Sequence, residues 1–470
     1  MTGAGDRLSV GEMFALTGRD APEEVRALPF PAHVATDSRD VQPGGAFVAL
    51  EGERTDGHRY IPQAVERGAG LIVVRRGKRP EGLSTPCVEL DEPELELSEM
   101  ASACLEKLQV AEVVAVTGSV GKTTTRAALQ QVLSKRFRVH AAERSLNTRI
   151  GCTATVLAMP SITELLLLEF GANKPGEIAE LTRLFPPTSA LITRVAPVHL
   201  EGFGSIEGVL KGKMEIAGSS RLRQLLYNGD DPLLRDAARA LRPPVRAFGT
   251  GRAAAADFQI GIPRFEMTEE APALTFQLSN KSGEVAVIHA SVWGEHAAWP
   301  LAFAAAMGNR LGIPLEECAG ALRDFKSLPG RGRVLRLDGG RFLVDDAYNA
   351  NPASMRASLE AFIRLDPGGA RAAVLGEMKE MGPEAPGYHR DLLPLLHSLD
   401  RVVLVGAMWS EAFAGIPGYE PAGNHTLVSD WQEALEIVNG AEWKGLLVKG
   451  SNSLGLSNLV QALAGEAGDS

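Results

Sequence analysis

The sequence predicts an α/β protein of three domains, and three observations support that prediction. Short apolar runs alternate with helical segments, which is typical of parallel sheets covered by helices. The alternation restarts after a segment rich in Pro, Gly and basic residues at 326–333. With 470 residues, the chain is also too long for one ordinary core. We expect a small α/β N-terminal domain (1–106), a central parallel-sheet domain (107–327) and a C-terminal Rossmann-like domain (328–470).

The first two predicted domains differ in their apolar patterns. In the N-terminal domain, short apolar runs at 46–50 and 70–74 predict strands, and 60–69 predicts a helix. The central domain opens with a strand at 112–117, a Gly-containing turn and a helix at 123–135. Further central strands are expected at 165–170, 189–195 and 223–228, an antiparallel addition between about 257 and 292, and an Ala-rich helix at 296–311.

The C-terminal domain repeats the alternation of strand and helix. Its four predicted strands are 341–347, 371–377, 401–407 and 445–451. The segment 326–333 before them is predicted to be a linker.

Composition excludes several classes of protein. The net charge of −10 argues against a nucleic-acid-binding surface. No apolar run reaches the ~20 residues that span a bilayer, so we expect no membrane insertion. The cysteines are scattered and form no C-x-x-C pair, which favours reduced thiols and a cytoplasmic location.

A phosphate-binding loop follows the first strand of the central domain. Residues 117–124 read T-G-S-V-G-K-T-T between a predicted strand and a predicted helix, the context that such a loop requires. Glycines let backbone N–H groups face phosphates, Lys122 neutralises their charge, and Thr123 offers a hydroxyl to Mg²⁺. The candidates for nucleotide binding are Gly118, Ser119, Val120, Gly121, Lys122, Thr123 and Thr124. The central domain is therefore predicted to be a P-loop domain.

An acidic residue ends the next strongly apolar strand. Glu169 closes the run L-L-L-L-E, and ligands bind at the carboxyl ends of strands in open α/β sheets. Mg²⁺ prefers oxygen ligands, so Thr123, Glu169, phosphate oxygens and water are a plausible set.

Several motifs in order resemble the Mur ligase family over nearly the whole chain. They are T-G-S-V-G-K-T-T, E-F-G-A-N-K-P-G-E-I (169–178), H-L-E-G-F-G-S (199–205), Y-N-G-D-D (227–231), V-D-D-A-Y-N-A-N-P (344–352), L-G-E-M-K-E-M-G (375–382) and V-K-G-S (448–451). Within the family, they resemble the branch that adds D-alanyl-D-alanine to UDP-N-acetylmuramoyl-tripeptide.

The resemblance implies an ATP-dependent amide ligase of peptidoglycan precursor synthesis that works through an acyl phosphate. It implies ATP and two Mg²⁺ ions as cofactors, the UDP-linked tripeptide and D-alanyl-D-alanine as substrates, and a monomer. The third residue of the tripeptide, diaminopimelate or lysine, stays open.

The resemblance also implies roles for particular residues. His199 would join Glu169 at a second Mg²⁺, and Lys213 would ligate that ion after carboxylation by CO₂. Ser38 and Arg39 would hold the UDP-sugar, Asn147 would contact substrate, and His296, Arg331 and Asp346 would contact the nucleotide, while Tyr348, Asn349 and Lys449 would line the dipeptide side.

The chain departs from the family pattern at three places. The family commonly carries two Asn residues around the adenine pocket, where this chain has Ala297 and Pro300. Arg149 replaces a usually acidic residue, and Asn452 stands where an Arg is common. We expect weakened adenine recognition, because an Asn hydrogen bond is lost.

Three other functions share part of this pattern. A sister ligase, which adds the third peptide residue, commonly carries a D-Y-A-H-type motif. This chain has D-A-Y-N-A-N-P at that place, which argues against the sister activity. A P-loop kinase or GTPase would leave the second α/β domain unexplained. A non-catalytic nucleotide-binding paralogue is suggested only by the altered adenine pocket.

Overall fold

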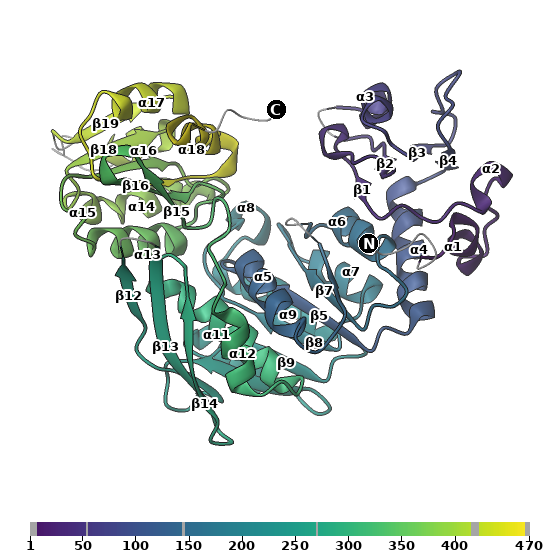
Figure 1. The fold of residues 1–470 in the computed structure, drawn as a ribbon, viewed down its shortest axis with the longest axis horizontal. Coiled ribbons are helices and arrows are strands. Elements are labelled where there is room, and N and C mark those ends of the chain that lie inside the picture. The colour runs from purple at the N-terminus through teal and green to yellow at the C-terminus, as the bar shows by residue number, and fades with distance from the viewer. Residues whose placement is uncertain (1–6, 53–54, 143–145, 269–270, 415–422, 466–470) are drawn as a thin grey trace.

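The computed structural model describes residues 7–52, 55–142, 146–268, 271–414 and 423–465. The described chain forms three α/β parts, each built around its own β-sheet, which confirms the predicted fold class. The N-terminal and C-terminal parts lie at opposite ends of the central part (Figure 1). None of the helices in these ranges is long and apolar enough to cross a membrane.

The N-terminal part has a four-stranded parallel sheet. Its strands are β1 (Val34–Ala35), β2 (Ala46–Val48), β3 (Leu71–Arg75) and β4 (Cys87–Leu90), in the order β1-β2-β3-β4. Its helices are α1 (Val10–Leu16), α2 (Glu23–Arg26), α3 (Ile61–Glu66) and α4 (Pro93–Leu108). The expected strands near 46–50 and 70–74 are therefore present.

The central part has a ten-stranded mixed sheet. Its strands are β5 (Glu112–Thr117), β6 (Val139–Ala141), β7 (Leu165–Glu169), β8 (Ser189–Ile192), β9 (Gln224–Asn228), β10 (Arg246–Gly251), β11 (Phe258–Ile260), β12 (Arg264–Met267), β13 (Pro272–Asn280) and β14 (Val285–Ala290). The order is β12-β13-β11-β10-β9-β8-β5-β7-β6, and β14 pairs with β13. Strands β5 to β11 are parallel, and β12 to β14 form the expected antiparallel addition.

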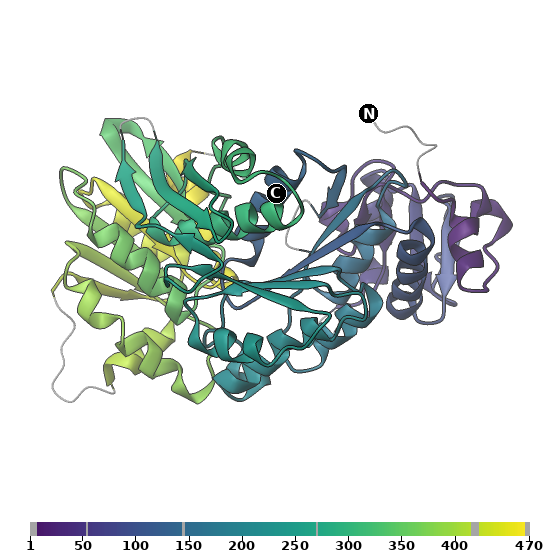
Figure 2. The same ribbon diagram turned by 90° about the horizontal axis from the view of Figure 1, so that it is seen from below.

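Helices cover both faces of the central sheet, which Figure 2 shows from below. They are α5 (Lys122–Leu133), α6 (Arg149–Leu157), α7 (Glu177–Leu184), α8 (Leu200–Phe203), α9 (Ile206–Met214), α10 (Pro232–Arg239), α11 (Ala298–Arg310) and α12 (Leu315–Leu322). Every residue of β7 is buried, which is why its sequence is apolar without alternation. The helix predicted from 296 begins at Ala298, because Glu295–Ala297 form a 3₁₀ turn instead.

The C-terminal part has a six-stranded sheet. Its strands are β15 (Arg333–Leu337), β16 (Arg341–Asp346), β17 (Arg371–Gly376), β18 (Arg401–Val405), β19 (His425–Val428) and β20 (Gly445–Lys449), in the order β15-β16-β20-β17-β18-β19. Its helices are α13 (Pro352–Ile363), α14 (Ala385–Arg390), α15 (Leu393–Leu396), α16 (Ala407–Ala414), α17 (Trp431–Asn439) and α18 (Leu456–Ala464).

Two strands of this sheet were not predicted. β15 begins at Arg333, the last residue of the expected linker, and pairs antiparallel with β16. β19 lies at the other edge of the sheet and contains no buried residue. Edge strands bury less surface than central ones, so their sequences carry a weaker apolar signal.

Candidate active site

The phosphate loop joins β5 to α5 in a conformation that requires glycine. Gly118 has a φ of 139°, and a Cβ there would lie 2.1 Å from Thr193 Oγ1. Gly121 has a φ of 83° and immediately precedes Lys122, the first residue of α5. The loop therefore presents its backbone and the N-terminus of α5 to a common space, the arrangement that binds phosphate groups.

Neighbouring backbone holds this loop in place. Ser119 N–H donates to the Arg194 carbonyl over 2.8 Å, and Thr193 Oγ1 donates to the Val120 carbonyl over 2.6 Å. Lys122 Nζ donates to the Gly118 carbonyl over 2.8 Å. Burial in the protein lowers the pKa of Lys122, because it removes water from the ammonium. The negative charge of a bound phosphate would offset this cost.

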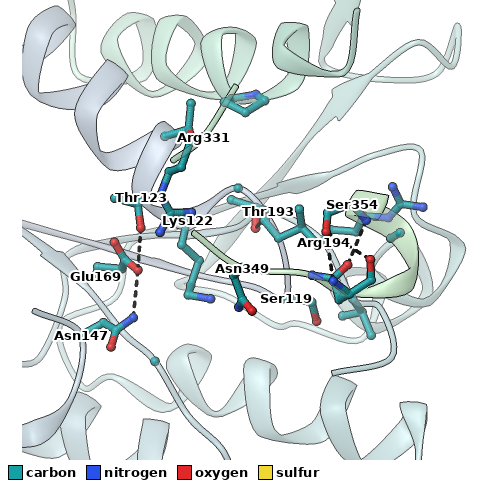
Figure 3. Close-up of a pocket in the computed structure, with 18 of the residues that line it drawn as sticks. Ser119, Lys122, Thr123, Asn147, Glu169, Thr193, Arg194, Arg331, Asn349 and Ser354 are labelled. Carbon is teal, nitrogen blue, oxygen red and sulfur yellow. Dashed lines mark hydrogen bonds between the residues drawn. The ribbon is translucent and has the colours of Figure 1, made fainter. Parts of the chain in front are cut away.

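Glu169, at the carboxyl end of β7, lies close to several polar side chains (Figure 3). Thr123 Oγ1 lies 3.2 Å and Asn147 Nδ2 lies 3.0 Å from Glu169 Oε1. Arg126 Nε lies 3.8 Å from Glu169 Oε2. The structure therefore brings together the predicted residues Thr123, Asn147 and Glu169.

Lys213 is an almost fully buried lysine on α9, only 1% exposed. Its Nζ donates to the Ala172 carbonyl over 3.3 Å and lies 5.2 Å from the centre of the Phe203 ring. Burial, with a further contribution from the positive charge of Lys122, lowers the pKa of Lys213 to about 7. A large share of this amine is therefore neutral at neutral pH, unlike an exposed lysine.

His199 lies half-buried immediately before α8. Its Nδ1 contacts the carboxylate of Glu380, a residue of the C-terminal part. Burial lowers the pKa of His199, while the Glu380 carboxylate acts in the opposite direction. A carboxylate only accepts hydrogen bonds, so Nδ1–H of His199 is the donor in this contact.

The predicted residues of the C-terminal part form a second polar group. Arg331 lies over the Tyr348 ring, 4.2 Å from its centroid. Lys449 Nζ pairs with Asp346 Oδ2 at 2.8 Å and donates to the Asn349 carbonyl over 3.0 Å. These two contacts fix the position of the buried Lys449 side chain.

One cavity of about 1260 Å³ unites these groups between the central and C-terminal parts. Its lining includes the predicted residues Ser119, Val120, Gly121, Lys122, Thr123, Thr124, Asn147, Glu169, His199, His296, Arg331, Asp346, Tyr348, Asn349 and Lys449. This volume exceeds that of a typical single-ligand pocket of about 300–1,000 Å³, which suits more than one substrate.

Four predicted residues do not line the cavity. Gly118 and Lys213 lie immediately behind its wall, since Lys213 bonds to the cavity-lining residue Ala172. Ser38 lies in the N-terminal part, where its hydroxyl donates to Gln63 Oε1 over 2.6 Å. Arg39 is exposed there and pairs with Asp37 at 2.6 Å.

The side of the cavity next to the phosphate loop is partly apolar. Pro300 Cγ lies 3.7 Å from the position of a Cβ built on Gly121. His296 is reached by solvent through the cavity, yet the surrounding protein lowers its pKa to about 4. Trp299 also lines the cavity, and its Nε1 donates to Asp230 Oδ2 over 2.9 Å. The contact between Trp299 and Asp230 had not been predicted from the sequence.

Arg149, the departure beside Asn147, bridges two parts of the molecule. Its guanidinium lies 3.0 Å from Glu94 of α4 and 2.7 Å from Glu180 of α7. The basic residue therefore pairs with two carboxylates where the family commonly has an acidic one.

Comparison with known proteins relates this arrangement to one family. The Mur ligase middle domain matches residues 116–308, the Mur ligase, glutamate ligase domain matches 330–452, and the Mur ligase family, catalytic domain matches 32–118. The chain is 31% identical over 435 residues to the UDP-N-acetylmuramoyl-tripeptide–D-alanyl-D-alanine ligase of Bacillus subtilis (strain 168), covering 92% of each chain. The enzyme of the same name from Escherichia coli (strain K12) is 32% identical over 436 residues, 92% of this chain and 93% of its own.

Solved structures give the same relationship. MurF from Acinetobacter baumannii superposes with a TM-score of 0.76 at 27% identity, covering 92% of this chain and 93% of that chain. The MurF ligase from Thermotoga maritima, solved in complex with ADP, superposes with a TM-score of 0.73 at 27% identity, covering 92% and 97%.

Proposed function

This chain belongs to the Mur ligase family, and from that membership we propose that it joins D-alanyl-D-alanine to UDP-N-acetylmuramoyl-tripeptide with conversion of ATP to ADP and phosphate. The observation that carries the proposal is that the phosphate loop and Tyr348, Asn349 and Lys449 of the C-terminal part line the same cavity. The relatives that bear the name of this activity match over most of the chain.

The reaction proceeds in two steps. A terminal carboxylate oxygen of the tripeptide attacks the γ-phosphorus of ATP, ADP leaves, and an acyl phosphate forms. The amine of D-alanyl-D-alanine then attacks the acyl carbon, phosphate leaves with the former carboxylate oxygen, and the amine loses a proton. Lys122 stabilises the charge that develops on the transferred phosphoryl group, and the cavity aligns the reactants.

The chain carries side chains of the kinds that could hold two Mg²⁺ ions. Thr123 Oγ1 and Glu169 Oε1 lie 3.2 Å apart and provide oxygen donors for a first ion. Glu169, His199 and carboxylated Lys213 would hold a second ion, as the resemblance to the family implies. Bound Mg²⁺ supplies charge neutralisation for the phosphate oxygens.

Lys213 fits the role of a carboxylated lysine. An ammonium cannot ligate a metal, whereas a carbamate offers anionic oxygens. The pKa of Lys213 is lowered to about 7, so the neutral amine is available to attack CO₂, with formation of an N–C bond and loss of a proton.

Each of the three parts binds a different substrate. Residues 1–106, with Ser38 and Arg39, hold the UDP-sugar; residues 107–327 bind ATP, with Asn147 beside the tripeptide end; and residues 328–470 hold the dipeptide. Arg331, His296 and Asp346 contact the nucleotide. We place the enzyme in the cytoplasm as a monomer.

Phosphate release measured with purified protein tests the proposal. Release from ATP should require both the UDP-tripeptide and D-alanyl-D-alanine, and mass spectrometry should detect the UDP-pentapeptide. Assays with the UDP-dipeptide plus diaminopimelate or lysine test the sister activity. Efficient turnover with those substrates in place of the proposed pair would contradict the assignment.

A further inference from the structure

Two residues far apart in the chain meet at the boundary between the central and C-terminal parts. His199 precedes α8, and Glu380 follows β17. The Glu380 carboxylate contacts His199 Nδ1, and the Glu380 carbonyl accepts a hydrogen bond of 3.1 Å from Leu200 N–H. The two segments are therefore joined by a side-chain contact and a backbone contact at one point.

Both residues have an unusual backbone. Within the described ranges, the non-glycine residues with positive φ are Gln109, His199 and Glu380, at 48°, 49° and 62°. Two of these three contact each other. Non-glycine residues in the left-handed region persist where the surrounding structure holds them, and they concentrate at functional sites. The unusual backbone of both residues therefore coincides with their contact.

The chemistry of the contact determines which nitrogen of His199 carries the proton. A carboxylate only accepts hydrogen bonds, so Nδ1 of the neutral imidazole carries the proton and Nε2 keeps its lone pair. Histidines that ligate metals commonly donate their other ring N–H to a carboxylate, which fixes the tautomer and ring orientation. His199 lines the cavity, whereas Glu380 does not.

We propose that Glu380 is a positioning residue that the C-terminal part supplies to the His199 site, so that docking of this part completes the site. It acts through His199, keeping Nε2 as an acceptor directed at the reaction space. The role of this acceptor as a metal ligand rests on the proposed function; the tautomer and its origin do not.

The neighbouring acidic residues are engaged elsewhere. Glu377 Oε2 accepts a hydrogen bond of 3.0 Å from Met408 N–H, and its other oxygen contacts Lys379. Glu384 accepts a hydrogen bond of 3.0 Å from the Tyr388 hydroxyl. Glu384 is exposed, as Glu380 is, so Glu384→Gln is a matched control for a change of charge near the boundary.

Nitrogen NMR of the full chain, labelled with ¹⁵N only at its nine histidines, tests the tautomer without substrates. The His199 signal is identified by its loss in His199→Gln. We expect the Nδ1–H form in the unmodified protein and in Glu380→Gln, whose amide oxygen still accepts. Glu380→Ala should move His199 towards the Nε2–H form, and Glu384→Gln should leave it unchanged.

Two other histidines serve as internal references. His58 donates Nδ1–H to Asp56 and accepts from Arg75 N–H, and His389 accepts at Nε2 from Met378 N–H. Their signals should stay constant in Glu380→Ala, which shows that the variant is folded. An unchanged His199 signal in folded Glu380→Ala would overturn the proposal. If the reference signals are lost, the same test is made on Glu380→Met, whose unbranched side chain has a similar length and no carboxylate, and a retained Nδ1–H form there would also overturn the proposal.

Metal dependence provides the second readout. Loss of a carboxylate behind a metal-binding histidine typically weakens metal affinity or activity about 10–100-fold. Glu380→Ala should raise the Mg²⁺ concentration for half-maximal phosphate release by about that factor, and Glu380→Gln by less. A changed tautomer with unchanged Mg²⁺ dependence would retain the positioning contact but refute its link to the metal. Absence of ligase activity in the unmodified protein would refute the proposed function and leave the tautomer result intact.

Discussion

The phosphate loop and the apolar wall beside it lie against the same cavity but are built by different means. The loop depends on left-handed glycines, backbone contacts and buried charged or hydroxyl groups of the central sheet. The wall consists of Trp299, Pro300 and Ala297, and the last two stand where the family commonly has Asn. A transferred phosphate needs fixed charges at fixed places, whereas a flat base can also be held by stacking and shape. The wall can therefore vary while the loop is kept.

The largest effect is expected at the loop. Lys122→Ala should reduce kcat at least about 10²–10³-fold, the usual consequence of losing one group that stabilises the transition state. The melting temperature should stay close to that of the unmodified protein, because within the described part of the chain the Lys122 ammonium donates to a carbonyl of its own loop. Lys135→Ala, beyond the other end of α5, is the control for loss of a lysine charge. A Lys122→Ala enzyme with most of its activity would contradict the assigned role.

Substitution of Lys213 should have the next largest effect on ligase activity, because it removes the proposed carbamate. Lys213→Arg should be nearly inactive, since guanidinium can neither ligate a metal nor form the carbamate. Lys213→Ala should also be inactive, and added acetate should restore part of its rate. Lys211→Ala is the control on the exposed side of the same helix. Full activity of Lys213→Arg in CO₂-depleted buffer would exclude the carbamate.

The same lysine predicts a pH dependence. Its folded pKa of about 7 lies below the ordinary value of 10.5, so the folded state binds fewer protons than the unfolded state between these values. Stability from this group should therefore rise with pH from about 7 to 10.5. Chemical denaturation in CO₂-depleted buffer, where Lys213 is the free amine, should show a shallower rise in Lys213→Met over several pH values. An identical slope in both proteins would show that the amine is not desolvated.

The apolar wall should show a smaller effect. Without the two Asn residues, discrimination between ATP and GTP should be weaker than in relatives, because fewer polar groups would be left unpaired by the wrong base. Pro300→Asn should increase the preference for ATP by roughly fivefold to tenfold, about one hydrogen bond. Ratios of kcat/KM for the two nucleotides measure this. Strict ATP preference in the unmodified protein would show that another group reads the base.

The smallest effect is expected at Arg149, outside both regions. Its side chain and those of Glu94 and Glu180 are about one-third exposed, so each ion pair contributes about 1 kcal/mol or less. Arg149→Ala should lower the melting temperature slightly, and the loss should shrink at high salt. Arg183→Ala, on the same helix as Glu180, is the control. A large, salt-independent loss would indicate a role beyond these pairs.

The features that the sequence predicted correctly depend on residues that are close together in the chain. The run that became β7 is buried throughout, so its apolar pattern identified both the strand and the position of Glu169 at its end. The glycines of the phosphate loop have a local requirement for positive φ. Contacts between parts carry no such signal: Glu380 lies 181 residues from His199, and Trp299 lies 69 residues from Asp230.

Transfer of an oxygen atom tests the central claim most directly. The tripeptide is labelled with ¹⁸O in both oxygens of its reacting carboxylate and converted with ATP and D-alanyl-D-alanine. In an acyl-phosphate mechanism, one carboxylate oxygen becomes the bridging atom and leaves with phosphate. The account predicts one ¹⁸O in each phosphate released and one in the new amide of the product. Phosphate without ¹⁸O, released at the same rate as the pentapeptide forms, would contradict it.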